Sequence, residues 1–270
     1  MITFKSFDVN SNTFDTAILT WEISPSLESL SDYQIKIYRG ENEISLSGID
    51  VAGSGIDYLP TSTFLYEDDY VKNIQYDKAM NVFYQLSAKH KIDSIEYKSE
   101  IRGLNVLSIS KVSREIARRD MIVFKNVIRG KYFLLKIKTT GNVCSCYDDI
   151  LGEKVIVGDH IVCYNTSIVD GYYDPYMLYG NMGSFSENAR IGPVGGIIET
   201  NVTQFVTGIF PHISVNDILI DKLGRRWRVG YNNGPESKMD PYRQLLSIQE
   251  IDRSDIIYKF PVDLTILNSY

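Results

Sequence analysis

The segment that decides how this chain is organised is GNVCSCYDDILGEKVIVGDHIVCYNTSIVDGYY, residues 141–173. It contains all three cysteines of the sequence, Cys144, Cys146 and Cys163, and one of only three histidines, His160. The spacing is C-x-C, a gap, and then H-x-x-C. Thiolate sulfur and imidazole nitrogen are ligands that zinc prefers, and four such donors complete the shell of a structural Zn²⁺. The segment therefore predicts a structural zinc knuckle.

The spacing leaves a second interpretation open. One residue between the first two cysteines is fewer than is usual for paired zinc ligands. The alternative is three small buried apolar cysteines beside a hydrogen-bonded histidine. An odd number of clustered cysteines does not form a disulfide framework, which favours a reducing cytoplasm as the place of synthesis.

Composition and charge are those of a folded protein without a general affinity for DNA or membranes. The chain has 270 residues, of which 44% are hydrophobic and 23% charged, and its formal net charge is −6. This length allows two domains of ordinary size. The negative charge argues against non-specific DNA binding by the whole chain. We expect no secretory signal and no membrane span, because no run approaches ~18 apolar residues.

Residues 1–106 are predicted to form a β-sandwich. Short alternating runs, such as TAILTW with Trp21 and VFYQLSAKH with Tyr84, are separated by breakers rich in Pro, Ser and Gly. No helical pattern lies between them, which is typical of two packed sheets. This part of the chain resembles a fibronectin type III module. The resemblance implies a spacing or adhesion unit without chemistry of its own, in which Trp21 and Tyr84 pack in the core.

Ser108–Phe124 is the one convincing helix, and residues 107–128 are predicted to link the two domains. Apolar residues recur there at helical spacing: Ile109, Val112, Ile116 and Val123. The pair Arg118–Arg119 could bind a phosphate group. A solvated or interface face with local ion pairs is the preferred interpretation.

Residues 129–270 are predicted to form a small antiparallel barrel or sheet that carries the knuckle. A glycine turn joins two alternating runs in NDILIDKLGRRWRV, which is typical of a β-hairpin. Its arginines could contact a DNA backbone or an acidic neighbour: Arg225, Arg226 and Arg228.

Five tyrosines lie between residues 164 and 179. Amphipathic rings are common in protein interfaces, so this loop predicts a contact surface, with ordinary loop packing as the alternative. The tyrosines singled out for contacts are Tyr172, Tyr173 and Tyr176.

Residues 110–262 resemble neck proteins of tailed bacteriophages. The resemblance rests on REIARRDMIVF, on G-x-x-C-x-C-Y-D from Gly141, on CYNT followed by GYYDP, and on DILIDKLGRRWRV. In that family, paired C-x-x-C knuckles precede a Gly-Tyr-Tyr segment. Here the first knuckle is C-x-C, and His160 replaces the first cysteine of the second. Cys144, Cys146, His160 and Cys163 are the positions that carry over.

The resemblance implies a virion subunit, assembled in the host cytoplasm, that forms a ring between portal-side and tail proteins. Packaged DNA would make a passing contact with such a ring. The alternatives are a tail or baseplate adaptor, or a virion module that binds a carbohydrate or receptor. A zinc-dependent hydrolase is a further class, but it needs an open coordination position and a general base. Because G-x-S-x-G, H-E-x-x-H and a Walker loop are all absent from the sequence, we expect no enzymatic activity.

Overall fold

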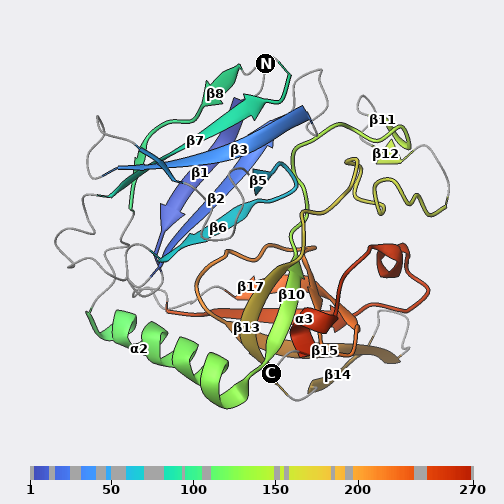
Figure 1. Ribbon diagram of the computed structural model, residues 1–270. Coiled ribbons are helices and arrows are strands. Elements are labelled where there is room, and N and C mark those ends of the chain that lie inside the picture. The colour runs from blue at the N-terminus through green and yellow to red at the C-terminus, as the bar shows by residue number, and fades with distance from the viewer. Residues whose placement is uncertain are drawn as a thin grey trace. The chain divides into compact units, whose positions relative to one another are not determined.

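Figure 1 shows the computed structural model of the chain, which contains two compact units. The structure describes residues 3–11, 16–24, 32–40, 47–49, 59–69, 82–92, 95–104, 111–148, 153–154, 158–183, 186–191, 197–233 and 242–268. The first unit comprises residues 1–108 and 138–143, and the second comprises residues 109–137 and 144–270. The helical segment predicted as a linker therefore counts with the second unit.

The first unit contains two antiparallel sheets. One has the order β1 (Thr3–Asn10), β2 (Ala17–Ser24), β6 (Leu65–Asp68). The other has the order β4 (Ser47–Ile49), β3 (Tyr33–Gly40), β7 (Phe83–His90), β8 (Glu96–Lys98), and β5 (Leu59–Pro60) and β9 (Arg102–Gly103) pair with β3 and β7. The prediction of antiparallel β-structure for this part of the chain is confirmed.

The core of the first unit follows directly from the alternation of its strands. In β3, every second residue from Tyr33 to Ile37 is buried, and the residues between them are partly exposed. The same period places Trp21 of β2 and Tyr84 of β7 in one apolar cluster that draws residues from both sheets. Successive side chains of a strand point to opposite faces, so each sheet contributes one face to this core.

The second unit is a closed antiparallel barrel of six strands. In order, the strands are β10 (Lys131–Leu135), β16 (Ile218–Ile220), β17 (Arg226–Asn233), β18 (Gln244–Glu250), β15 (Ile197–Thr207) and β13 (Tyr176–Met182). The pairing of β13 with both β15 and β10 closes the barrel. The predicted mainly β fold with a small C-terminal barrel is confirmed, and so is the hairpin of β16 and β17.

Shorter elements complete the second unit. They are α2 (Lys111–Ile122), the π-helix η4 (Val123–Ile128), β11 (Tyr147–Asp148), β12 (Glu153–Lys154), β14 (Ser186–Ile191), the 3₁₀-helix η5 (Ile256–Lys259) and α3 (Thr265–Asn268). Strand β14 pairs with the first half of the long strand β15. Among the described residues, no helix is long and apolar enough to cross a membrane.

One glycine permits the barrel to close. A Cβ at Gly180 of β13 would collide with the ring of Phe205 and with the carbonyl oxygen of Val206, both on β15. The Phe205 ring is fully buried and packs edge-on against Tyr132 of β10 at 4.8 Å between centroids. A residue without a side chain is therefore needed at this position of β13, where it faces the Phe205 ring.

The helix α2 is present as predicted, but it buries a different face from the one its apolar periodicity indicates. Ala117 is 4% exposed and Phe124 of η4 is 5% exposed, whereas Val112, Ile116 and Val123 are at the surface. The segment ends at Arg129, whose left-handed conformation lets its N–H reach the carbonyl of Phe124.

Candidate metal centre

Tight turns bring the four predicted ligands together. The first cysteine pair lies in a turn in which the N–H of Tyr147 donates to the carbonyl of Cys144 at 3.0 Å. In the second segment, the N–H of Cys163 donates to the carbonyl of His160 at 3.4 Å. The two segments are joined by a backbone bond of 2.8 Å from Cys144 to the carbonyl of Ser167. Each pair therefore lies in a hydrogen-bonded local turn.

Local polar residues explain why the second segment folds this way. The Asn165 side chain accepts from the N–H of His160 at 3.1 Å and donates to Asp159 at 3.0 Å. The hydroxyl of Thr166 donates to the carbonyl of Cys163 at 2.7 Å. At Gly171 the backbone has a φ of 48°, and a Cβ there would collide with the Cys163 carbonyl. Asn, Thr and Gly suit these roles because they tolerate or satisfy turn backbone.

The four ligand atoms lie within 4.8 Å of one another. The sulfur of Cys144 is 3.1 Å from Nδ1 of His160, and the sulfurs of Cys146 and Cys163 are 3.3 Å apart. A tetrahedron with metal–sulfur bonds of about 2.3 Å has edges of about 3.7 Å, so a zinc ion fits between these atoms after a small expansion. The prediction that these four residues gather into one possible metal site is confirmed.

Burial makes the thiols dependent on one another. All three cysteines are at most 1% exposed, and Val169 packs against them. Burial opposes ionisation of Cys144, but hydrogen bonds from Cys146, Cys163 and Ser145 outweigh it and lower the pKa of Cys144. Burial and the neighbouring thiols raise the pKa of Cys146 to about 12. A bound cation would favour the thiolate at every cysteine, because metal binding displaces the thiol protons.

The donor set is of the structural type. Three cysteines and one histidine fill a tetrahedral shell, which leaves no position for a substrate. Within the part of the chain that the structure describes, no Asp or Glu joins the four ligands. The neighbouring Asp159 is exposed and engaged by Asn165. The site thus offers a metal a closed shell without an adjacent general base.

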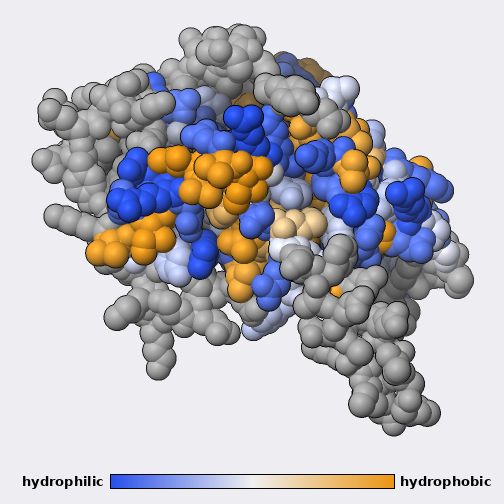
Figure 2. All heavy atoms as spheres, turned by 90° about the horizontal axis from the view of Figure 1, so that it is seen from below, coloured by the Kyte–Doolittle hydropathy of each residue, from blue (hydrophilic) through white to orange (hydrophobic). Residues whose placement is uncertain are grey.

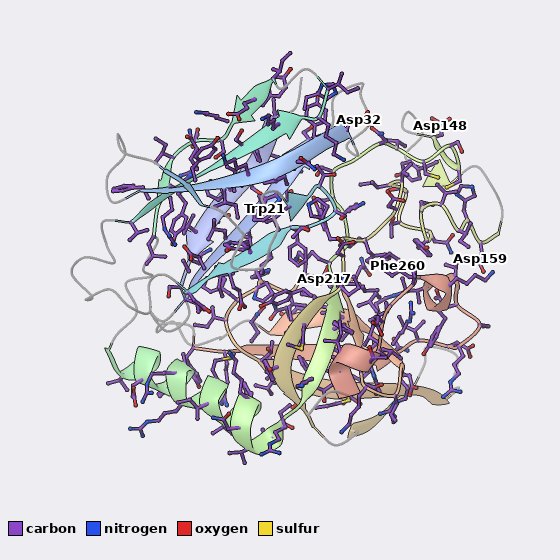
Figure 3. All side chains as sticks on the ribbon, viewed as in Figure 1. Trp21, Asp32, Asp148, Asp159, Asp217 and Phe260 are labelled. Carbon is purple, nitrogen blue, oxygen red and sulfur yellow. The ribbon has the colours of Figure 1, made fainter. Side chains whose placement is uncertain are left out.

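Aromatic rings connect the knuckle to the barrel. The ring of Tyr164 lies 5.1 Å from that of Phe260, and the ring of Tyr172 lies 6.0 Å from it, both edge-on. Tyr172 also forms a β-bridge with Ile137, and the N–H of Tyr173 donates to the carbonyl of Lys136 at 2.9 Å. Figure 3 labels Phe260 between the knuckle segment and the barrel. The loop after Cys163 is therefore part of the core of the second unit.

A buried carboxylate secures the end of β10, a role that sequence reasoning missed. Asp217, labelled in Figure 3, is fully buried and accepts from the N–H of Ile137 at 2.9 Å and from that of Ser214 at 2.7 Å. Its other partner is the ammonium group of Lys136 at 3.1 Å. Burial raises the pKa of Asp217, and Lys136 opposes that shift. The only sequence signal was an acidic residue before an apolar strand, which is common in surface turns.

The predicted contact residues have other roles in the structure. Tyr172 and Tyr173 are 6% and 7% exposed, so these two rings do not form the contact surface that the loop composition predicted. Tyr176 is partly exposed at the start of β13. The ring of Tyr172 is buried because it belongs to an apolar cluster that includes Ile257 of η5 and Leu267 of α3.

The hairpin arginines are engaged within the chain. Arg226 is buried, and its guanidinium donates to the carbonyls of Ile257 and Phe260. Arg225 pairs with Asp221 at 2.8 Å, and Arg228 pairs with Asp255 at 3.4 Å. Arg226 is therefore unavailable for the external contact predicted for it, whereas the other two remain partly exposed.

No protein-family model matches the chain, and no curated protein sequence matches it significantly.

Proposed function

We propose that the chain is a structural subunit whose second unit is held by a tetrahedral zinc ion on Cys144, Cys146, His160 and Cys163. The observation that carries the proposal is the closed donor set: four soft or borderline ligands with their atoms within 4.8 Å, three of them buried. Such a shell contributes to folding and leaves no coordination position for catalysis. We therefore propose a structural and not a catalytic role for this site.

The setting that we propose for this subunit is the neck of a tailed bacteriophage. The sequence resemblance supplies the setting, namely a ring between portal-side and tail proteins. A rigid barrel with a metal-bound loop is suited to such a position, because ring subunits must keep their shape under load. The partners would be further copies of the chain and the neighbouring portal, neck or tail proteins.

Two measurements on the purified full chain test the proposal. Elemental analysis is expected to give one zinc per chain for the wild type and none for Cys163→Ser. Negative-stain microscopy and light scattering are expected to show closed rings. A folded chain without metal would remove the knuckle from the proposal, and a chain that forms only open or two-fold assemblies would remove the neck ring.

Carbohydrate binding by the first unit is the second candidate, and one pocket favours it. The pocket has a volume of about 410 Å³ and lies where β1 approaches β8 and β9. Phe4, Phe7 and Tyr97 contribute aromatic side chains to its lining, beside the polar residues Ser6 and Arg102. Aromatic faces with a few polar groups suit a sugar ring. Calorimetry with cell-surface polysaccharides, comparing wild type with Tyr97→Ala, would detect this activity.

A further inference from the structure

The helical segment of the second unit carries an exposed apolar stripe. Val112 is 69% exposed, Ile116 38%, Val123 41% and Val127 72%. Their spacing of four, seven and four residues places them along one side of the segment. Figure 2 shows apolar clusters interleaved with charged side chains on the face of the molecule seen from below. Exposure of four branched apolar side chains in one row is unfavourable in water, and burial against a partner surface would lower the free energy.

The opposite side of the segment already has its partner. Ala117 and Phe124 are buried, a Cβ at Gly208 would meet the sulfur of Met121, and the ammonium group of Lys125 lies 5.4 Å from the centre of the Tyr179 ring. Arg243 next to β18 approaches Asp120 at 4.0 Å. The segment is thus fixed on the barrel by one side, and the stripe is not needed for that contact.

Charged residues around the stripe are mainly basic. Residues 111–131 contain seven Lys or Arg and two acidic residues, a net charge of +5 in a chain of net charge −6. Glu115 is shared by Arg118 at 2.9 Å and Arg119 at 2.8 Å, so one carboxylate serves two guanidinium groups. The surface beside the stripe is therefore positively charged.

The complementary charge lies elsewhere on the same chain. Residues 1–108 contain nine basic and sixteen acidic residues, a net charge of −7. Residues 132–270 contain twelve basic and sixteen acidic residues, a net charge of −4. The first unit of a second copy therefore carries a net charge opposite in sign to that of the basic helix, and charge complementarity of this kind selects and orients partners.

We propose that the exposed side of α2 and η4 is a subunit–subunit contact, in which the stripe packs on the acidic first unit of a second copy of this chain. The contact joins two different surfaces, so it is head-to-tail and can close into a ring. This contact would be the interface of the ring proposed above. The contact itself does not depend on the proposed function; only the closure into a ring does. Nucleic acid would bind the basic residues but leave the stripe uncovered, because phosphate groups gain nothing from contact with four apolar side chains.

The test is the self-association of the full, zinc-loaded chain by sedimentation velocity over a wide range of concentration. The variant Val123→Glu/Val127→Glu is expected to weaken association at least about tenfold, because it places charges in an apolar contact. Leu223→Glu is the matched control: Leu223 is 72% exposed in the turn after β16 and lies outside the stripe. Circular dichroism melting verifies that both variants remain folded. Added salt is expected to weaken the wild-type assembly, because the contact pairs unlike charges.

Each outcome decides the proposal. Weakening by the stripe variant and not by Leu223→Glu supports the contact, even if the assembly proves to be a pair and the neck ring fails. Rings that persist in the stripe variant overturn the contact and leave the proposed function standing. A wild type that is monomeric throughout overturns both. Binding of a labelled DNA duplex that is lost in the stripe variant, without self-association, would assign the surface to nucleic acid instead.

Discussion

The two units of this protein differ in how far their buried polar side chains reach along the chain and how many backbone groups they bind. In the described part of the first unit, Asp68 accepts from Arg39 at 2.8 Å and from the hydroxyl of Tyr84 at 3.0 Å, and the hydroxyl of Ser99 bonds the backbone of Leu86 and of Glu100. In the second, buried side chains bind backbone. The amide of Gln244 donates to the carbonyls of Gly208, Ile209 and Pro211 and accepts from the N–H of Ile213.

The difference reflects how much of each unit lies in regular strands. Strands in a sandwich satisfy their own N–H and C=O groups in ladders, so the core needs only alternating apolar residues. The second unit has irregular segments around residues 208–217 and 251–264, whose backbone groups lie outside the ladders. Asp217, Gln244 and Arg226 supply partners to these segments. The second unit should therefore depend on polar and metal contacts far more than the first.

Removal of the proposed metal is expected to have the largest effect on stability and to affect the second unit alone. Cys163→Ser, or a strong chelator, should cost the second unit several kcal/mol, because the binding energy of a structural zinc ion is folding energy. Hydrogen exchange followed by mass spectrometry should show faster exchange in residues 144–173 and the barrel, with the first unit unchanged. Zinc should restore the chelated wild type but not the variant. Equal protection with and without metal would contradict the dependence.

Disruption of the buried ion pair of Lys136 and Asp217 should have the second largest effect on stability. Asp217→Ala removes the acceptor for two backbone N–H groups and leaves the Lys136 ammonium group without a counter-charge, at a cost of about 3–5 kcal/mol. Urea unfolding monitored by Trp227, which is buried in the barrel, measures the loss. Lys136→Met/Asp217→Asn is the control, because it removes both charges and keeps a polar side chain at position 217. If the single and double variants are equally unstable, the pairing itself contributes nothing.

Loss of the buried carboxylate of the first unit, Asp68, should cost less stability. Asp68→Ala should destabilise that unit by about 1–3 kcal/mol, since Arg39 is partly exposed and can turn to water while the Tyr84 hydroxyl loses its partner. Hydrogen exchange of β3 and β7 reports the loss. Tyr84→Phe is the matched control and should cost less, because it leaves the ion pair intact. A loss as large as that of Asp217→Ala would contradict the contrast between the units.

The sequence predicted those parts of the fold that depend on local period and residue type. Alternation identified Trp21 and Tyr84 as core residues, and the spacing of the cysteines and histidine identified the four residues that gather into one possible metal site. It could not predict the buried side of α2, because Val112 and Ala117 are both compatible with a helix and the barrel decides which of them is covered. It also could not predict the role of Asp217, whose partner Ile137 lies 80 residues away in the chain. The buried polar contacts of Asp217, Arg226 and Gln244 join residues that are distant in the sequence, so no local pattern predicts them.

The smallest effect is expected on the exposed helix, where charges are paired in water. The guanidinium groups of Arg118 and Arg119 lower the pKa of Glu115 to about 2. A carboxyl group with a lowered pKa stabilises the folded state above its unfolded pKa, and that contribution is lost as the pH falls towards 2. The melting temperature of Glu115→Gln should therefore be slightly lower than that of wild type at neutral pH, and the gap should close in acid. NMR titration of the Glu115 carboxyl measures the shift directly, and Arg118→Gln/Arg119→Gln should return the pKa towards its ordinary value. An ordinary pKa in the wild type would mean that solvent screens these pairs completely, as it does for many surface ion pairs.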